Sequence, residues 1–72
     1  MIHFLVIFEQ TSSGFSAYSP DFPGCIATGS THEEVEKNML EAVRFHIEGM
    51  KIEKLPIPNS SKATAEKFAV SV

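Results

Sequence analysis

The side chains that could do chemistry in this chain are one cysteine, three histidines and nine carboxylates. Cys25 would need a neighbouring base to form a reactive thiolate, and local spacing places no base beside it. His32 and His46 are fourteen positions apart on one predicted helix, so about 21 Å separates them along its axis and they cannot hold one metal ion together. Most carboxylates fall on the surface of the same helix, where solvated charge is their usual role. The residues therefore predict no catalytic group, no metal site and no cofactor.

The size and charge of the chain restrict its class. Its 72 residues, of which 43% are hydrophobic, fit a single domain over residues 1–72. A domain this small buries only about 60% of the surface of its unfolded chain, so we expect further burial against a second copy or a partner. The net charge of -3 disfavours nucleic acid and suits a basic partner. A lone cysteine, no secretory signal and no membrane-spanning apolar run predict a cytoplasmic protein outside the membrane.

Three strands are predicted in the first half of the chain. Residues Ile2–Phe8 alternate apolar side chains on both faces, which is typical of a strand covered on two sides. A turn over residues 10–14 leads into a second strand, Phe15–Ser19, so the two form a hairpin. Cys25–Thr28 reads as a short third strand.

A helix and a last strand are predicted in the second half. Thr31 and Glu34 have the spacing of a capping box, and the apolar period that follows predicts a helix ending before Pro56. The tail Glu66–Val72 alternates apolar and polar residues, which indicates a half-buried strand. The fold class is α+β with the order βββαβ. A right-handed crossover through the helix would place the last strand parallel to the first, giving a mixed four-stranded sheet with one helix on one face.

One helix covers only one face of such a sheet, while Leu5 and Ile7 point to the other. We therefore expect a homo-oligomer, in its simplest form a dimer, that buries Leu5 and Ile7 or pairs strand edges. Phe45 lies well away from the main apolar face of the helix. It either packs under the Pro56–Ser61 connector or belongs to a contact surface.

The segment between the second and third strands, Ser19-Pro20-Asp21-Phe22-Pro23-Gly24-Cys25, has two interpretations. Proline fixes φ, aspartate caps a turn and glycine takes conformations closed to other residues, so the segment can be simply a sharp corner. A rigid loop also presents Asp21 and Phe22 outward at low entropic cost, which favours binding.

The pattern of several segments together resembles the HicB family of antitoxins. The residues that carry the resemblance are Gly14 to Cys25, Ala27 to Thr31, the helix through Asn38, Glu41-Ala42 and Phe45 to Gly49, and Pro56-Ile57-Pro58. The resemblance implies a partial, degraded ribonuclease H-like fold that neutralises a small basic, HicA-like, mRNA-cleaving toxin by masking its active surface. The residues that we expect to contact this partner are Tyr18, Pro20, Asp21, Phe22, Pro23, Gly24 and Phe45.

Two features bear on what such a family member does. A ribonuclease H-type nuclease needs converging carboxylates for two Mg²⁺ ions, but Ile2–Phe8 contains no acid, so we expect no enzyme activity. Most full-length family members carry a C-terminal DNA-binding segment, whereas this chain ends at Val72 without one. We therefore expect a minimal form without the C-terminal DNA-binding segment. The alternative is a solitary regulator, associated with nucleic acid as an oligomer, that has no toxin partner.

Overall fold

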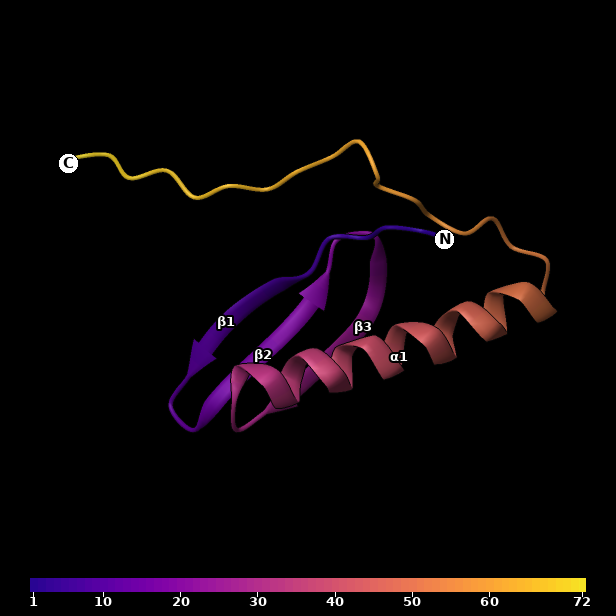
Figure 1. Ribbon diagram of the computed structural model, residues 1–72, viewed down its shortest axis with the longest axis horizontal. Coiled ribbons are helices and arrows are strands. Elements are labelled where there is room, and N and C mark those ends of the chain that lie inside the picture. Colours follow the sequence, from indigo (N-terminus) through magenta and orange to yellow (C-terminus); the bar gives the residue numbers. More distant parts are fainter.

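Three strands and one helix make up the fold in the computed structural model, which describes residues 1–72 (Figure 1). The elements are β1 (Ile7–Thr11), β2 (Gly14–Ser19), β3 (Phe22–Gly29) and α1 (His32–Ile52). The strands form one antiparallel sheet in the order β1-β2-β3. The helix crosses one face of this sheet and packs mainly against β3 and β2. The α+β class and the first four elements of the predicted order are therefore confirmed.

The β1–β2 hairpin is confirmed, but β1 begins later than predicted. Ile7 pairs with Tyr18 at the open end of the hairpin, and Thr11 pairs with Gly14 at the turn. Residues before Ile7 pair with no residue of β2, which ends at Ser19, one position past Tyr18. The backbone N–H of Leu5 instead donates to the Asp21 carboxylate over 2.9 Å. The predicted start at Ile2 was therefore wrong, since a side chain takes the hydrogen bond that a longer strand would make.

A bulge in β3 makes this strand longer than the predicted Cys25–Thr28. Tyr18 pairs with Ile26 and the next residue of β2 pairs with Phe22, so residues 23–25 have no partner in β2. Gly24 has φ of 90°, which residues with a Cβ rarely adopt. This extra length breaks the two-residue alternation and lets both Phe22 and Cys25 point into the core.

The helix begins where the capping box predicted. Thr31 is the N-cap, and its hydroxyl accepts a hydrogen bond from the backbone N–H of Glu34 over 3.0 Å. The Glu34 carboxylate accepts from the N–H of Ser30 over 3.4 Å. The helix ends at Ile52, before Pro56 as predicted, with Glu53 as its C-cap. This single helix is not apolar enough to cross a membrane.

The core lies between α1 and the sheet. Its buried apolar side chains are Ala17, Phe22, Cys25, Ala27, Val35, Met39 and Val43. Side chains of the N-terminal segment and the connector complete it at half-buried positions, among them Phe4, Val6 and Ile57. Cys25 is therefore a small apolar strand residue, and burial raises the pKa of its thiol.

The predicted fourth strand, Glu66–Val72, is wrong, and so is the mixed four-stranded sheet. The tail carries no strand, and its apolar Phe68 and Val70 are 90% and 83% exposed. Figure 1 shows the tail running past β1 and away from the body of the domain. Because α1 packs mainly over β3 and β2, a strand beyond β1 would lie outside the helix's cover and bury little apolar surface. The tail does alternate apolar and polar residues, but its apolar side chains have no apolar layer to pack against.

Candidate protein-binding surface

The sheet face opposite α1 carries a row of apolar side chains across all three strands. Ile7 pairs with Tyr18, and Tyr18 pairs with Ile26, so the three side chains lie side by side on this face. Tyr18 is 43% exposed and Ile26 67% exposed, while Ile7 is half-buried. We call Ile7, Tyr18 and Ile26 the open-face row. Ile7 and Tyr18 were predicted as contact residues and Ile26 was not, although the strand period around Cys25 and Ala27 already placed Ile26 on this face.

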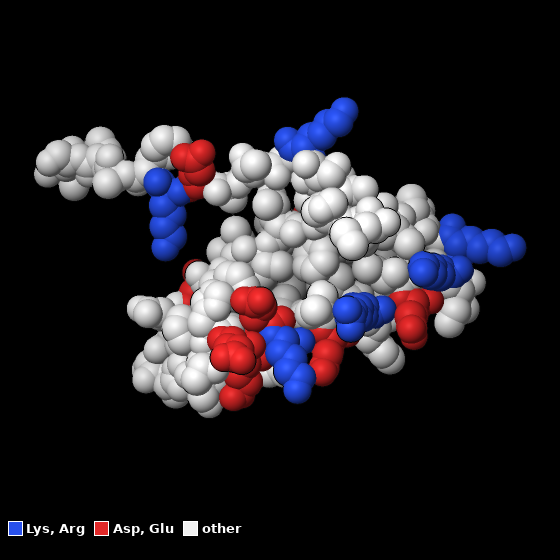
Figure 2. Space-filling view, in the orientation of Figure 1, with Lys and Arg blue, Asp and Glu red and all other residues white.

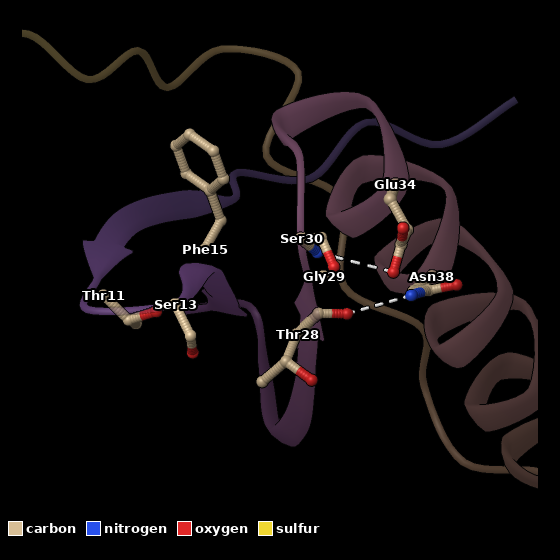
Figure 3. Close-up of a pocket in the computed structure, with 8 residues that line it drawn as sticks. All are labelled: Thr11, Ser13, Phe15, Thr28, Gly29, Ser30, Glu34 and Asn38. Carbon is tan, nitrogen blue, oxygen red and sulfur yellow. Dashed lines mark hydrogen bonds between the residues drawn. The ribbon is translucent and has the colours of Figure 1, made fainter.

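A polar row follows the open-face row one step further along the strands. Glu9 pairs with Ser16, and Ser16 pairs with Thr28. Thr28 also lines an open hollow of about 600 Å³ between the hairpin turn and the start of α1 (Figure 3). The other residues that line it are Thr11, Ser13, Phe15, Gly29, Ser30, Glu34 and Asn38. The lining has one carboxylate and no basic group, so the hollow suits a cationic or hydrogen-bond-donating side chain.

Asp21 holds three segments of the chain together and does not point outward as predicted. One oxygen of its carboxylate, Oδ2, accepts hydrogen bonds from the N–H of Leu5 over 2.9 Å and from the hydroxyl of Ser60 over 2.8 Å. The N–H of Ser60 in turn donates to the carbonyl of His3. We call Leu5, Asp21 and Ser60 the Asp21 clasp. The Leu5 N–H, and after it the Ser60 hydroxyl, lower the pKa of Asp21.

Phe22 lies in the core, so the prediction that the loop presents it outward was also wrong. Its side chain is 1% exposed. The ring of Phe4 meets it edge-on at 5.5 Å between centroids, and the ring of His46 does so at 6.0 Å. Three other residues of the segment, Pro20, Pro23 and Gly24, are exposed. The segment is therefore an anchored corner whose prolines and glycine are the part left to contact another molecule.

Phe45 lies on a different surface from the rest of the predicted contact residues. It is 80% exposed on α1, so it does not pack under the connector. Beside it, a hollow of about 280 Å³ is lined by Phe45, His46, Gly49, Met50, Glu53 and Leu55. The open-face row, which includes Tyr18, lies in the sheet layer on the other side of the core from the helix surface that carries Phe45. The predicted contact residues thus divide between two surfaces.

Charge is distributed unevenly over the surface that carries α1. Figure 2 shows acidic side chains gathered over the first part of the helix, followed by acidic and basic side chains in alternation. The first turn contains Glu33 and Glu34. No group of three or more His, Cys, Asp or Glu residues in the structure could hold a metal ion. The acidic start of α1 lies next to the hollow that contains Glu34, so both features favour a basic ligand.

Comparison with known proteins identifies the family. Residues 3–69 match the family described as HicB_like antitoxin of bacterial toxin-antitoxin system. The chain belongs to this family. The HicB_like assignment confirms the resemblance seen in the sequence, and membership of an antitoxin family suggests a role that is not enzymatic.

Individual proteins of a phage and an archaeon are similar in sequence to this chain. An uncharacterized 14.9 kDa protein of Haemophilus phage HP1 is 38% identical over 56 residues, which are 78% of this chain and 42% of the phage protein. A UPF0150 protein of Thermoplasma acidophilum is 34% identical over 64 residues, which are 85% of this chain and 93% of that protein. The chain therefore spans less than half of the phage relative but nearly all of the archaeal one.

One solved structure shares the fold. A chain of the HicA3 and HicB3 toxin-antitoxin complex superposes with a TM-score of 0.63 at 36% sequence identity. The match covers 76% of this chain and 64% of that chain. The arrangement of three antiparallel strands and one helix is thus a HicB-like fold.

Proposed function

We propose that this protein is an antitoxin-type binding module that neutralises a small basic, HicA-like, mRNA-cleaving toxin by masking its active surface. The observation that carries the proposal is the 36% identity and shared fold with a chain of a toxin-antitoxin complex, joined to the family match over residues 3–69. The net charge of -3 supports a basic partner. The site of action would be the cytoplasm, where such a toxin meets mRNA.

The toxin would dock on the open sheet face. The open-face row supplies exposed aromatic and aliphatic side chains in the centre of a patch, and the polar row supplies a rim. Pro20, Pro23 and Gly24 border this surface on a rigid corner, and so lose little entropy on contact. The free edge of β1 offers unpaired backbone groups to an added strand.

The hollow at the start of α1 would receive a basic side chain of the toxin. Its only charged lining residue is Glu34, and Ser13, Thr28 and Ser30 add hydroxyl groups that accept hydrogen bonds. Glu33 lies one residue away in the same first turn. A lysine or arginine would therefore find acceptors and negative charge together. The degraded ribonuclease H-like origin of the fold stays a hypothesis beside this proposal.

A homodimer through Leu5 and Ile7, which the sequence predicts, would compete with the toxin. Ile7 belongs to the open-face row, so the two partners would cover the same surface. Toxin binding would then convert such a dimer into a complex with one antitoxin chain per interface. Measuring molar mass with and without toxin distinguishes this sheet-face dimer from a dimer formed elsewhere.

Co-expression tests the proposal. The small basic protein encoded beside this gene, produced with this chain, should co-purify with it, and this chain should restore growth of cells that express the basic protein. The double variant Tyr18→Ser, Ile26→Ser should weaken both effects, because it removes the apolar centre of the open face. Phe45→Ser is the control, since it removes an exposed apolar side chain from another surface.

Two outcomes would contradict the proposal. If no adjacent gene encodes such a protein and none is recovered from the source cells, the toxin-neutralising role is wrong. If complex formation is lost in Phe45→Ser and kept in the double variant, the docking surface is wrong. A gel shift of the upstream promoter at moderate salt would instead favour the alternative of a solitary nucleic-acid regulator.

A further inference from the structure

The outer side of α1 carries a stripe of alternating small and large residues, of which Ala42 is half-buried and the other three are exposed. Ala42, Phe45, Gly49 and Ile52 follow one another at spacings of three and four, so they lie on one side of the helix. Phe45 and Ile52 are 80% and 82% exposed. We call these four residues the α1 stripe. Gly49 forms part of the hollow of about 280 Å³ beside Phe45.

We propose that two copies of this chain pair through the α1 stripe, with their helices antiparallel. With the two-fold axis at the level of Ile47, Phe45 of one copy lies opposite Gly49 of the other, and Ile52 lies opposite Ala42. Both large side chains thus meet small residues in a single register. A Cβ added at Gly49 would have no atom within 4 Å, so the space above this glycine is open to a side chain of the second copy.

The charges that flank the stripe are complementary in this antiparallel register. Along the helix they are acidic, basic, acidic and basic at Glu41, Arg44, Glu48 and Lys51. On the antiparallel second copy, the order of charges along the same direction is basic, acidic, basic and acidic. Arg44 therefore falls near Glu48 of the second copy, and Glu41 near its Lys51, each with an axial offset of about 3 Å. Long side chains span this offset easily.

These charged groups are unpaired within one copy. The ion pair in the structure joins His32 to Glu36 over 3.6 Å, and no basic side chain of the α1 stripe flank lies within 4.0 Å of a carboxylate. A parallel helix pair would place like charges side by side. The antiparallel pair instead places each of these four charges beside an opposite charge of the second copy. A second copy in this orientation is thus the occupant that the stripe fits.

This dimer goes beyond toxin binding and does not depend on it. The stripe lies on α1, and the open-face row lies in the sheet layer on the far side of the core. A dimer through α1 therefore leaves the open sheet face available to other partners. It also supplies the additional burial that a 72-residue chain needs.

Sedimentation equilibrium of the full chain tests the proposal. The wild type should associate reversibly into dimers, and Gly49→Leu should raise the dissociation constant at least about tenfold, because leucine fills the space opposite Phe45. Its helical circular dichroism should be undiminished, since leucine favours helix more than glycine does. Tyr18→Ser, on the open face, is the control that should leave dimerisation unchanged.

Charge exchange tests the orientation directly. Arg44→Glu makes this flank acidic at both central positions, and Glu48→Arg makes it basic, so each variant alone should be a weaker dimer than the wild type. Mixed in equal amounts, the two variants should form a heterodimer, because Glu at 44 then meets Arg at 48 of the other chain. A wild type that stays monomeric, or a mixture that does not associate, would overturn the proposal. A Gly49→Leu chain that dimerises as the wild type does would also overturn the proposal, even if that chain no longer bound the toxin.

Discussion

Replacing Phe22 by alanine should destabilise the fold severely without touching the binding surface. The side chain is 1% exposed and lies between the rings of Phe4 and His46. Truncating a phenylalanine buried to this extent costs about 3–5 kcal/mol, because the surrounding core closes the cavity only in part. A domain of 72 residues has a total stability of about 4–11 kcal/mol. The variant therefore loses about a quarter or more of this free energy, and Phe22→Leu loses less.

Urea unfolding followed by circular dichroism measures this loss. With a slope of about 1 kcal/mol per molar urea for a small chain, the midpoint should fall by about 3 M or more. Phe45→Ala, at a concentration where the monomer dominates, is the matched control. It should stay within about 0.5 kcal/mol of the wild type because Phe45 is exposed. Equal, small losses in both variants, with toxin binding lost only in Phe22→Ala, would refute the core assignment and make Phe22 a contact residue.

Three further predictions concern the clasp, the helix cap and a close backbone contact. The pKa of Asp21 is lower in the folded chain than its ordinary value of 3.8, so its stabilising effect is complete above that value and disappears as pH falls through the folded pKa. The stability difference between wild type and Asp21→Asn, followed by thermal unfolding, should therefore narrow from about pH 5 to about pH 2, and a gap independent of pH would contradict the clasp. Thr31→Ala should cost about 1 kcal/mol, because it removes the acceptor for the Glu34 N–H, and restoration by Thr31→Ser in the same urea assay would identify the cap. Gly29→Ala should cost about 1–3 kcal/mol, because its Cβ would lie 2.6 Å from the backbone nitrogen of Val35. Gly49→Ala, which meets no neighbour, should instead stabilise the monomer by about 0.5–1 kcal/mol.

Those features that depend on neighbours a few residues apart were predictable. The hairpin follows from two alternating segments around a short turn, and the N-cap follows from the spacing of Thr31 and Glu34. The outward position of Leu5 and Ile7 follows from strand alternation, since Phe4, Val6 and Phe8 pack against the core. Each of these patterns has a period of two to four residues, within the reach of local sequence.

The Pro20–Cys25 segment shows where local spacing stops being informative. Its prolines and glycine predicted a rigid corner, but the partners of Asp21 are Leu5 and Ser60, the latter thirty-nine positions along the chain. Phe22 faces inward because the bulge at residues 23–25 breaks the strand period. A bulge follows from the pairing of two strands, which no residue type in the loop specifies on its own.

By itself, the sequence determined the family, the HicB-like order of three strands and a helix, and the charge that suits a basic partner. Tertiary structure alone decided the register that sets Ile26 opposite Tyr18, the hydrogen bonds that make Asp21 a clasp, and the unpaired state of the tail. The physical reason is the same in each case. Alternation in a segment indicates only which side chains would share a face. Whether that face packs against another part of the chain depends on strand register, on hydrogen bonds between distant segments and on the area that α1 covers.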